Sequence, residues 1–478
     1  MKLVELAIYE KELNIAWVDY KFIEQRIDAQ YYKKEFVGNE IKIKQINNLP
    51  LKGIYTRGDY GTLPDSADYS QKGIYLIRGT DLRNLSIKED DLILVPEEYF
   101  SDKSEVKSED ILILIKGATI DAEWSVSIVP KINYKAIFNG SIFRIRLKKE
   151  YDPYFITAFM STKYFLNQKK RAISNTGIYY NDKDSIENFI IPIPSPDIQK
   201  YIGNKVRKAE ELREEAKRLK KEAEEILNRE LNLNKLEESL KSSINSKHNW
   251  ITSMDINDRI DSYYYKRRYI LVNQHLNDYE CIQIRDIASV DYGYMPTEDY
   301  ADENNGVPLI RVTNMIGNLL LDLSDLKYIS KSINIPDDKY VDDGDILVVQ
   351  CGNTTGKIAL MTKEVENYLY PSFCLRIKLR NKSINNKYLA LLMEMSIIQE
   401  QIWQSASYSS VRPNTTKPAI ENIRIPLIEK QKQEDVGALV EKYIDNIYQS
   451  KQLILEAKQD VEDLIEGNFD MSKVKANS

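Results

Sequence analysis

The chain has 478 residues, of which 42% are hydrophobic and 29% are charged, as in folded globular domains rather than disordered chains. Its 67 basic and 73 acidic side chains leave a formal charge of −6, which excludes a polycationic nucleic-acid binder and confines any nucleic-acid surface to local patches. The chain has three cysteines without a CxxC pair and only two histidines, which excludes zinc fingers. Its apolar runs are far shorter than the ~18 residues of a membrane span, which excludes membrane helices. We therefore expect a cytoplasmic protein.

Short apolar runs flanked by turn residues characterise residues 1–196. They predict β-strands at 73–77, 111–115 and 142–147. A helix is predicted after Asp152-Pro153, because aspartate caps helices and proline suits the first turn. Three prolines near position 194 end the strand pattern. We therefore expect a first mixed α/β domain over residues 1–196.

Residues 197–246 are predicted to form a long helix. Small apolar residues recur in it at alternating spacings of three and four, although most positions from 205 to 225 are charged. A solvated single helix held by ion pairs is the alternative. The narrow apolar seam favours a coiled coil instead.

The sequence then repeats itself. Arg26-Ile27-Asp28 recurs as Arg259-Ile260-Asp261, and later matches along the chain keep nearly the same offset. Such a repeat predicts a second α/β domain over 247–428 and a second helix over 429–470. The expected fold class is α+β, with two homologous mixed α/β domains joined by two long antiparallel coiled-coil helices in a pseudo-two-fold arrangement. The predicted seams are Ala209, Leu212, Ala216, Leu219, Ala223 and Ile226 in the first helix, and Tyr443, Ile447, Ser450, Ile454, Ala457 and Val461 in the second.

Catalytic motifs fail one by one. Gly352–Lys357 is similar to a P-loop, but three residues rather than four separate its glycines, and Ile358 stands where a magnesium-binding Ser or Thr belongs. The counterpart at 117–121 lacks the lysine, and both histidines lie in the second copy. Because the copies share no catalytic constellation, we predict a binding protein with no catalytic residue, cofactor or metal of its own.

Several short motifs follow in the same order in both copies. Each domain begins with Arg-Ile-Asp-x-x-Tyr-Tyr and ends with Ile-Glu-Asn and an Ile-Pro strand, and Gln199 or Gln433 opens the helix. The second copy also has a Gly-x-Thr-x-Gly-Lys-like turn and a loop leading to Arg412-Pro413-Asn414, whereas the first copy departs from both patterns. In this order of motifs the chain resembles the specificity (S) subunits of type I restriction–modification systems.

The resemblance implies two target-recognition domains, each reading one half of a bipartite, asymmetric double-stranded DNA site, with helices that space them. It further implies two modification (adenine methyltransferase) subunits and restriction subunits as partners, with S-adenosylmethionine, ATP and magnesium on those partners. Specificity subunits of type IIB or IIG systems share the architecture and remain an alternative. So does a coiled-coil scaffold that binds protein only.

Base readout in DNA uses Arg or Lys for guanine and Asn or Gln for adenine, presented from loops on a rigid scaffold. Turn chemistry is an equal alternative for each Asn or Thr. Basic pairs on strands, such as Arg144 with Arg146, are candidates for phosphate contacts, or else solvated strand faces. The predicted DNA contacts are Lys116, Thr119, Asn175, Thr176, Tyr179 and Tyr180 in the first copy, and Gln350, Asn353, Thr354, Thr355, Lys357, Tyr408, Ser409, Arg412 and Asn414 in the second.

Overall fold

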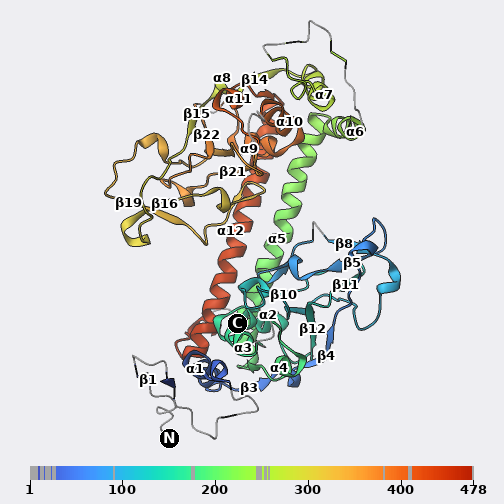
Figure 1. Cartoon of the computed structure of the whole chain (residues 1–478), viewed down its shortest axis with the longest axis vertical. Helices are drawn as coiled ribbons and strands as arrows, with labels where there is room; N and C mark the ends of the chain where they lie inside the picture. Colours follow the sequence, from blue (N-terminus) through green and yellow to red (C-terminus); the bar gives the residue numbers. More distant parts are fainter. Residues whose placement is uncertain are drawn as a thin grey trace. The chain divides into compact units, whose positions relative to one another are not determined.

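The computed structural model describes residues 9–10, 15–16, 23, 28–89, 92–173, 178–243, 250–251, 256, 259–380, 383–406 and 412–475. The chain divides into two compact units, one formed by residues 1–214 with 447–478 and the other by 215–446. The long helices α5 (Pro196–Glu230) and α12 (Lys430–Glu466) each contribute to both units. Each unit therefore combines one α/β copy with half of each long helix, which pair antiparallel (Figure 1).

The main sheet of the first unit has four antiparallel strands in the order β10-β9-β12-β4. Every residue of β9 is buried, as its uninterrupted apolar run predicts for a central strand. A second sheet, β11-β5-β8, lies in the same unit and contains a parallel pair. The bounds are β4 (Tyr55–Tyr60), β5 (Ile74–Ile77), β8 (Ile93–Val95), β9 (Ile111–Leu114), β10 (Val126–Ile128), β11 (Ala136–Phe138) and β12 (Ile142–Leu147).

The second unit repeats this topology. Its main sheet has the order β21-β20-β22-β15, so each strand corresponds to one of the first unit. The second sheet is reduced to the pair β16-β19. The bounds are β15 (Ala288–Tyr292), β16 (Gly306–Leu309), β19 (Lys327–Ser330), β20 (Ile346–Val349), β21 (Ile358–Leu360) and β22 (Cys374–Leu379).

Two small pairings also recur in both copies. A hairpin is formed by β6 (Leu82–Arg83) with β7 (Ser86–Ile87), and by β17 (Met315–Gly317) with β18 (Leu320–Leu321). An antiparallel pair ties the start of each copy to its end, as β3 (Asn48–Pro50) with β13 (Ile190–Pro192), and β14 (Cys281–Gln283) with β23 (Arg424–Pro426). Residues 9–10 and 15–16 form the short strands β1 (Tyr9–Glu10) and β2 (Ile15–Ala16).

The helices of the two copies start at matching places, which confirms the predicted repeat: α1 and α7 are separated by the same offset as Arg26 and Arg259. Asp152 caps α2 as predicted, because its carboxylate accepts from the amides of Tyr154 and Phe155, and Asn385 caps α9 in the same way. The helices of the first copy are α1 (Lys34–Ile43), α2 (Pro153–Met160), α3 (Lys163–Arg171) and α4 (Lys183–Glu187). Their counterparts in the second copy are, in the same order, α7 (Arg267–Leu276), α9 (Asn386–Glu394), α10 (Ser396–Ser405) and α11 (Lys417–Glu421). The remaining helices are α6 (Leu233–Ser243), α8 (Ile284–Ile287) and α13 (Ser472–Lys475).

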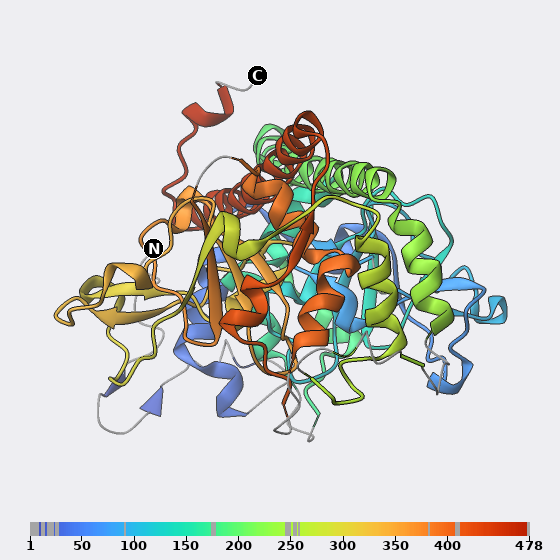
Figure 2. The ribbon, with the colours of Figure 1, turned by 90° about the horizontal axis from the view of Figure 1, so that it is seen from above.

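Helix α6 packs against α7 in the second unit, and the two lie side by side in both views (Figures 1 and 2). It buries Leu233, Leu236 and Leu240, and His275 of α7 hydrogen-bonds the carbonyl of Leu231 (2.8 Å). This bond joins α7 to the residue that follows α5.

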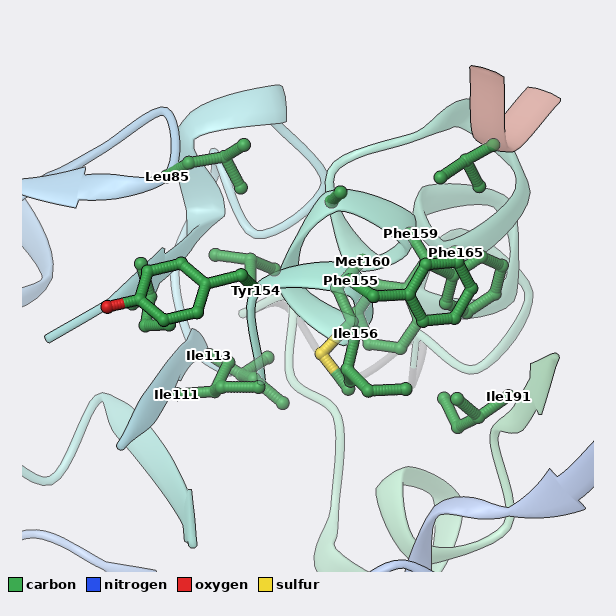
Figure 3. Packing of buried hydrophobic residues seen from close by; sticks show 14 of the residues in the cluster. Leu85, Ile111, Ile113, Tyr154, Phe155, Ile156, Phe159, Met160, Phe165 and Ile191 are labelled. Atoms are coloured by element: carbon green, nitrogen blue, oxygen red, sulfur yellow. The ribbon is translucent and has the colours of Figure 1, made fainter. Parts of the chain in front are cut away.

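The core of the first unit is continuous from sheet to coiled coil. Isoleucines of β9 pack with Phe155 and Phe159 of α2, as Figure 3 shows. The same cluster takes in Val206 and Ala209 of α5 and Ile454, Ala457, Val461 and Ile465 of α12. Because one apolar cluster holds both, the first domain and its part of the coil form one body.

The seam residues lie as follows. In α5 the first five predicted positions are buried, whereas Ile226 is only half-buried and Leu227 is fully buried in its place. An α-helix turns once in 3.6 residues, so a strict heptad drifts and the buried stripe moves by one residue. In α12, Ile447 is half-buried, and buried Ser450 donates its hydroxyl to the Ile447 carbonyl (2.7 Å). Tyr443, Ile454, Ala457 and Val461 are buried.

Each long helix is anchored to its own domain by the glutamine that opens it. The side chain of Gln199 accepts from the amide of Asp152 (3.2 Å) and donates to the Pro194 carbonyl (2.9 Å). Gln433 repeats this with the amide of Asn385 (3.4 Å) and the Ile428 carbonyl (3.0 Å). Both glutamines are buried, so the start of the helix and the cap of the neighbouring helix are bound together.

Candidate nucleic-acid interface

The predicted DNA contacts among the described residues gather at one end of each main sheet. Neighbouring strands run in opposite directions, so the turn that follows β9 lies beside the start of β12 and the end of β4. The turn that follows β20 has the same place in the second unit. We call these segments, 115–122 and 350–357, the sheet-end turns.

A later segment of each copy closes over the sheet-end turn. In the second copy Cys351 and Asn414 form a bridge, the amide of Gly352 donates to the Pro413 carbonyl (3.1 Å), and that of Thr415 to the Gln350 carbonyl (2.8 Å). Gly352 has φ +91°, a left-handed conformation that favours glycine. The turn and the Arg412–Asn414 segment, predicted separately, thus form one surface.

Three predicted contacts of the second copy use their polar groups in hydrogen bonds within the fold. Thr355 is buried and donates to the Gly352 carbonyl (2.7 Å). The Lys357 ammonium donates to the Met315 carbonyl (3.0 Å), and the Gln350 amide to the Ser372 carbonyl (3.1 Å). These bonds shape the turn. Asn353, Arg412 and Asn414 are exposed, and Thr354 is half-buried.

The first copy has the same closure with other side chains. Lys116 and Tyr180 form the bridge, and the amide of Gly117 donates to the Tyr179 carbonyl (3.1 Å). The Tyr180 hydroxyl donates to that of Tyr60 at the end of β4 (3.1 Å). Lys116, Thr119 and Tyr179 are exposed. The predicted contacts Asn175, Thr176, Tyr408 and Ser409 lie outside the described residues.

A buried lysine contacts the chain just after the first sheet-end turn. Lys169 of α3 is fully buried, and its ammonium donates to the Ser125 hydroxyl (2.8 Å), just after the turn. Burial lowers the pKa of Lys169 to about 7, and the nearby carboxylate of Asp121 offsets part of this effect. Lys169 is not among the predicted contacts, because it belongs to a basic run of the kind typical of a surface. A signal existed: Phe165, Lys169 and Ala172 share one helix face.

Two of the basic strand residues are buried and are therefore not phosphate contacts. Arg144 is fully buried and pairs with Asp59 and, at 3.6 Å, with Asp110. Arg376 occupies the same place in the second copy, 3.7 Å from Asp345, whose pKa burial raises to about 6. The interpretation of these arginines as phosphate contacts is wrong, because alternation along a strand does not tell which of two packed faces a side chain takes.

The described residues hold no group of three or more His, Cys, Asp or Glu placed to bind a metal ion. No helix in that part of the chain is long and apolar enough to cross a membrane.

The sheet-end turn of the second copy lies within a region that matches a known protein family. Residues 276–459 match the family model of the type I restriction modification DNA specificity domain. The matched residues cover most of the second copy, which is thus similar to this DNA specificity domain. The resemblance to specificity subunits is thereby confirmed. The first copy lies outside the matched residues, but its strand and helix order is that of the second copy.

Solved structures give looser likenesses. The chain is similar to the S subunit of a type I restriction–modification system from M. genitalium, with 13% identity, a TM-score of 0.45, and coverage of 89% of this chain and 96% of that one. It is also similar to the HsdS subunit from Thermoanaerobacter tengcongensis, with 15% identity, a TM-score of 0.29, and coverage of 88% and 96%. A search of curated proteins finds no match.

Proposed function

We propose that this chain is the DNA sequence-specificity subunit of a type I restriction–modification complex, in which each copy reads one half of a bipartite, asymmetric DNA site. One observation supports this most directly. The two copies present the same sheet-end turn and closing segment, but with different exposed side chains. Two half-sites of different sequence require this combination of a repeated scaffold and changed contacts.

The exposed side chains suit base readout in the major groove. In the second copy, Arg412 has the guanidinium that binds guanine in a bidentate manner, and Asn353 and Asn414 have amides that suit adenine. In the first copy, Lys116 can bind guanine or a phosphate, and Tyr179 offers an exposed ring. The backbone bonds within each surface hold these groups in place before DNA arrives, so that little ordering is needed on binding.

The long helices would space the two readers and dock two modification subunits. Helix α5 has 35 residues, which is ~52 Å at 1.5 Å per residue. This length suffices for two domains that address one face of a duplex about one turn, or ~34 Å, apart. Methyl transfer, ATP-driven movement and cleavage would be supplied by the modification and restriction subunits, with S-adenosylmethionine, ATP and magnesium. Those subunits would also provide phosphate neutralisation that a chain of charge −6 lacks.

The test is DNA binding and methylation by the full chain co-expressed with the modification subunits. Methylome sequencing of the host should reveal one bipartite motif, and mobility shifts should require both of its halves. The chain alone should transfer no methyl group from labelled S-adenosylmethionine. If the chain assembles with modification subunits yet no sequence preference is found, the protein-binding scaffold is the better explanation. Methyl transfer by the isolated chain would contradict its assignment as a non-catalytic subunit.

A further inference from the structure

The β17–β18 hairpin of the second copy has an unusual tip. Three successive residues, Gly317, Asn318 and Leu319, have φ values of +89°, +53° and +65°. Glycine adopts this left-handed region freely and asparagine tolerates it, but leucine is disfavoured there because its Cβ crowds the following carbonyl. Such a tip persists only when its surroundings hold it.

Both long helices hold this tip. The Lys220 ammonium of α5 donates to the Asn318 side-chain oxygen (2.7 Å), and the Tyr443 hydroxyl of α12 donates to the Asn318 carbonyl (2.9 Å). The amide of Leu319 donates to the carboxylate of Glu394 in α9 (2.9 Å), which also pairs with Lys220 (3.4 Å). All of these groups belong to the second unit, and Lys220 is only 18% exposed.

The hairpin in turn holds the sheet-end turn. At its base, the Met315 carbonyl accepts from the Lys357 ammonium, the last residue of the turn (3.0 Å). At its tip, the Leu319 carbonyl accepts from the amide of Leu360 in β21, a little further along the chain (3.0 Å). The chain that leaves the turn is thus bonded to the hairpin at two points.

We propose that the β17–β18 hairpin fixes the second sheet-end turn relative to the long helices, and that Lys220 and Tyr443 are positioning residues for recognition of the second half-site. Neither side chain lies in the sheet-end turn or in its closing segment. Each acts through Asn318, which both of them contact. The role in recognition rests on the proposed function, whereas the mechanical coupling does not.

The first copy gives a contrast. Its hairpin also has a left-handed tip residue, Leu85, which is buried in the apolar cluster of the first unit. A hydrogen bond to this hairpin comes from β10, where the Ser127 hydroxyl donates to the Arg83 carbonyl (2.7 Å). From the coil, Lys458 of α12 reaches this copy through an ion pair with Glu123, whose side chain is 68% exposed. We therefore expect the coupling through the hairpin to act on the second half-site.

Hydrogen exchange on the full chain tests the coupling without DNA. Tyr443→Phe removes one hydroxyl, and Lys220→Met removes the ammonium. Lys221→Met is the matched control, because Lys221 is the next residue along α5 and its side chain is 76% exposed. Among the described residues, Glu225 is its ion-pair partner (3.7 Å). We expect the amides of Lys357 and Leu360 to exchange roughly two- to tenfold faster in the first two variants, the effect of losing one hydrogen bond. Lys220→Arg should restore most of the protection.

The comparison amides are Gly117 and Asn181, which close the sheet-end turn of the first copy and should not change. Unchanged exchange at Lys357 and Leu360 in both variants would overturn the coupling. So would an equal rise over the whole second unit, since that pattern indicates general destabilisation rather than positioning.

Binding by the complex with modification subunits tests the specificity. The affinity ratio between cognate DNA and DNA with a scrambled second half-site should fall roughly two- to tenfold in Tyr443→Phe and Lys220→Met, again the effect of one lost hydrogen bond. The ratio for the first half-site should stay unchanged. Equal loss at both half-sites, or none, would contradict the positioning role. A wild-type complex without sequence preference would instead refute the proposed function, and the exchange result would still decide the coupling.

Discussion

In the first copy a lysine of α3 bonds Ser125, just after the sheet-end turn, whereas in the second copy a lysine inside the turn bonds a neighbouring hairpin. At the position of Lys169, the second copy has Ile402, which is equally buried. The backbone pairing of turn and closing segment is nevertheless the same. Backbone hydrogen bonds therefore preserve the scaffold, while the side chains that support it can change together with those that it exposes.

The largest expected effect concerns a feature that both copies share, the buried arginine of the sheet. Arg144→Met would remove the buried partner of Asp59, which costs up to about 3–5 kcal/mol of the free energy of unfolding. Asp110 keeps its bonds to Arg146 (2.7 Å), so it should contribute less to this loss. Urea unfolding measures it. Arg376→Met is the matched variant, and we expect a smaller loss because its carboxylate contacts are 3.4 and 3.7 Å long. Two equal, small losses would mean that the sheets do not depend on these pairs.

A second prediction separates the exposed groups of the two surfaces. Arg412→Ala should cost about 1–3 kcal/mol of binding free energy for the second half-site alone, the value of one good base contact. Lys116→Ala is the counterpart and should affect the first half-site alone. Binding of the complex to DNA with each half-site scrambled in turn measures both. A loss that is independent of sequence would instead place these residues on phosphates.

The third prediction uses the buried lysine of the first copy. Burial lowers the pKa of Lys169 from 10.5 to about 7, so the unfolded chain binds the proton more tightly than the folded chain. Stability should therefore rise as the pH increases above about 7, by at most about 1.4 kcal/mol per pH unit. Lys169→Ile, which introduces the residue of the second copy, should remove this rise in urea unfolding between pH 6 and pH 9. A variant with an unchanged pH profile would contradict the assignment.

The smallest expected effect is that of Lys458→Ala. Its partner Glu123 is largely exposed, so the ion pair should contribute only about 0.2–1 kcal/mol to stability. Added salt should weaken the contribution further. A double-mutant cycle with Glu123→Ala, measured by urea unfolding, gives the pair energy. A coupling energy well above about 1 kcal/mol between Lys458 and Glu123 would contradict this expectation. The ion pair would then connect the first copy to α12 as firmly as the hairpin contacts connect the second copy to the long helices.

Sequence alone determined the repeat, the element order and the helix caps of this protein. The offset between Arg26 and Arg259 reappears between α1 and α7, and Asp152 caps α2 as expected. These features depend on local patterns, because strand runs and capping residues act over a few neighbouring positions. The resemblance to specificity subunits followed from motif order and needed no structure.

Only the tertiary structure decided which polar side chains face solvent. Thr355 and Lys357 are predicted to contact DNA, but their polar groups are bonded within the fold. Arg144 and Lys169 belong to basic patterns that are typical of a surface, but both are buried. In the seam, Leu227 is buried in place of Ile226. In each polar case the deciding partner lies far away in the chain, as Met315 does for Lys357 and Ser125 for Lys169. A buried polar group is stable only when such a partner is present, and no local pattern of the sequence specifies it.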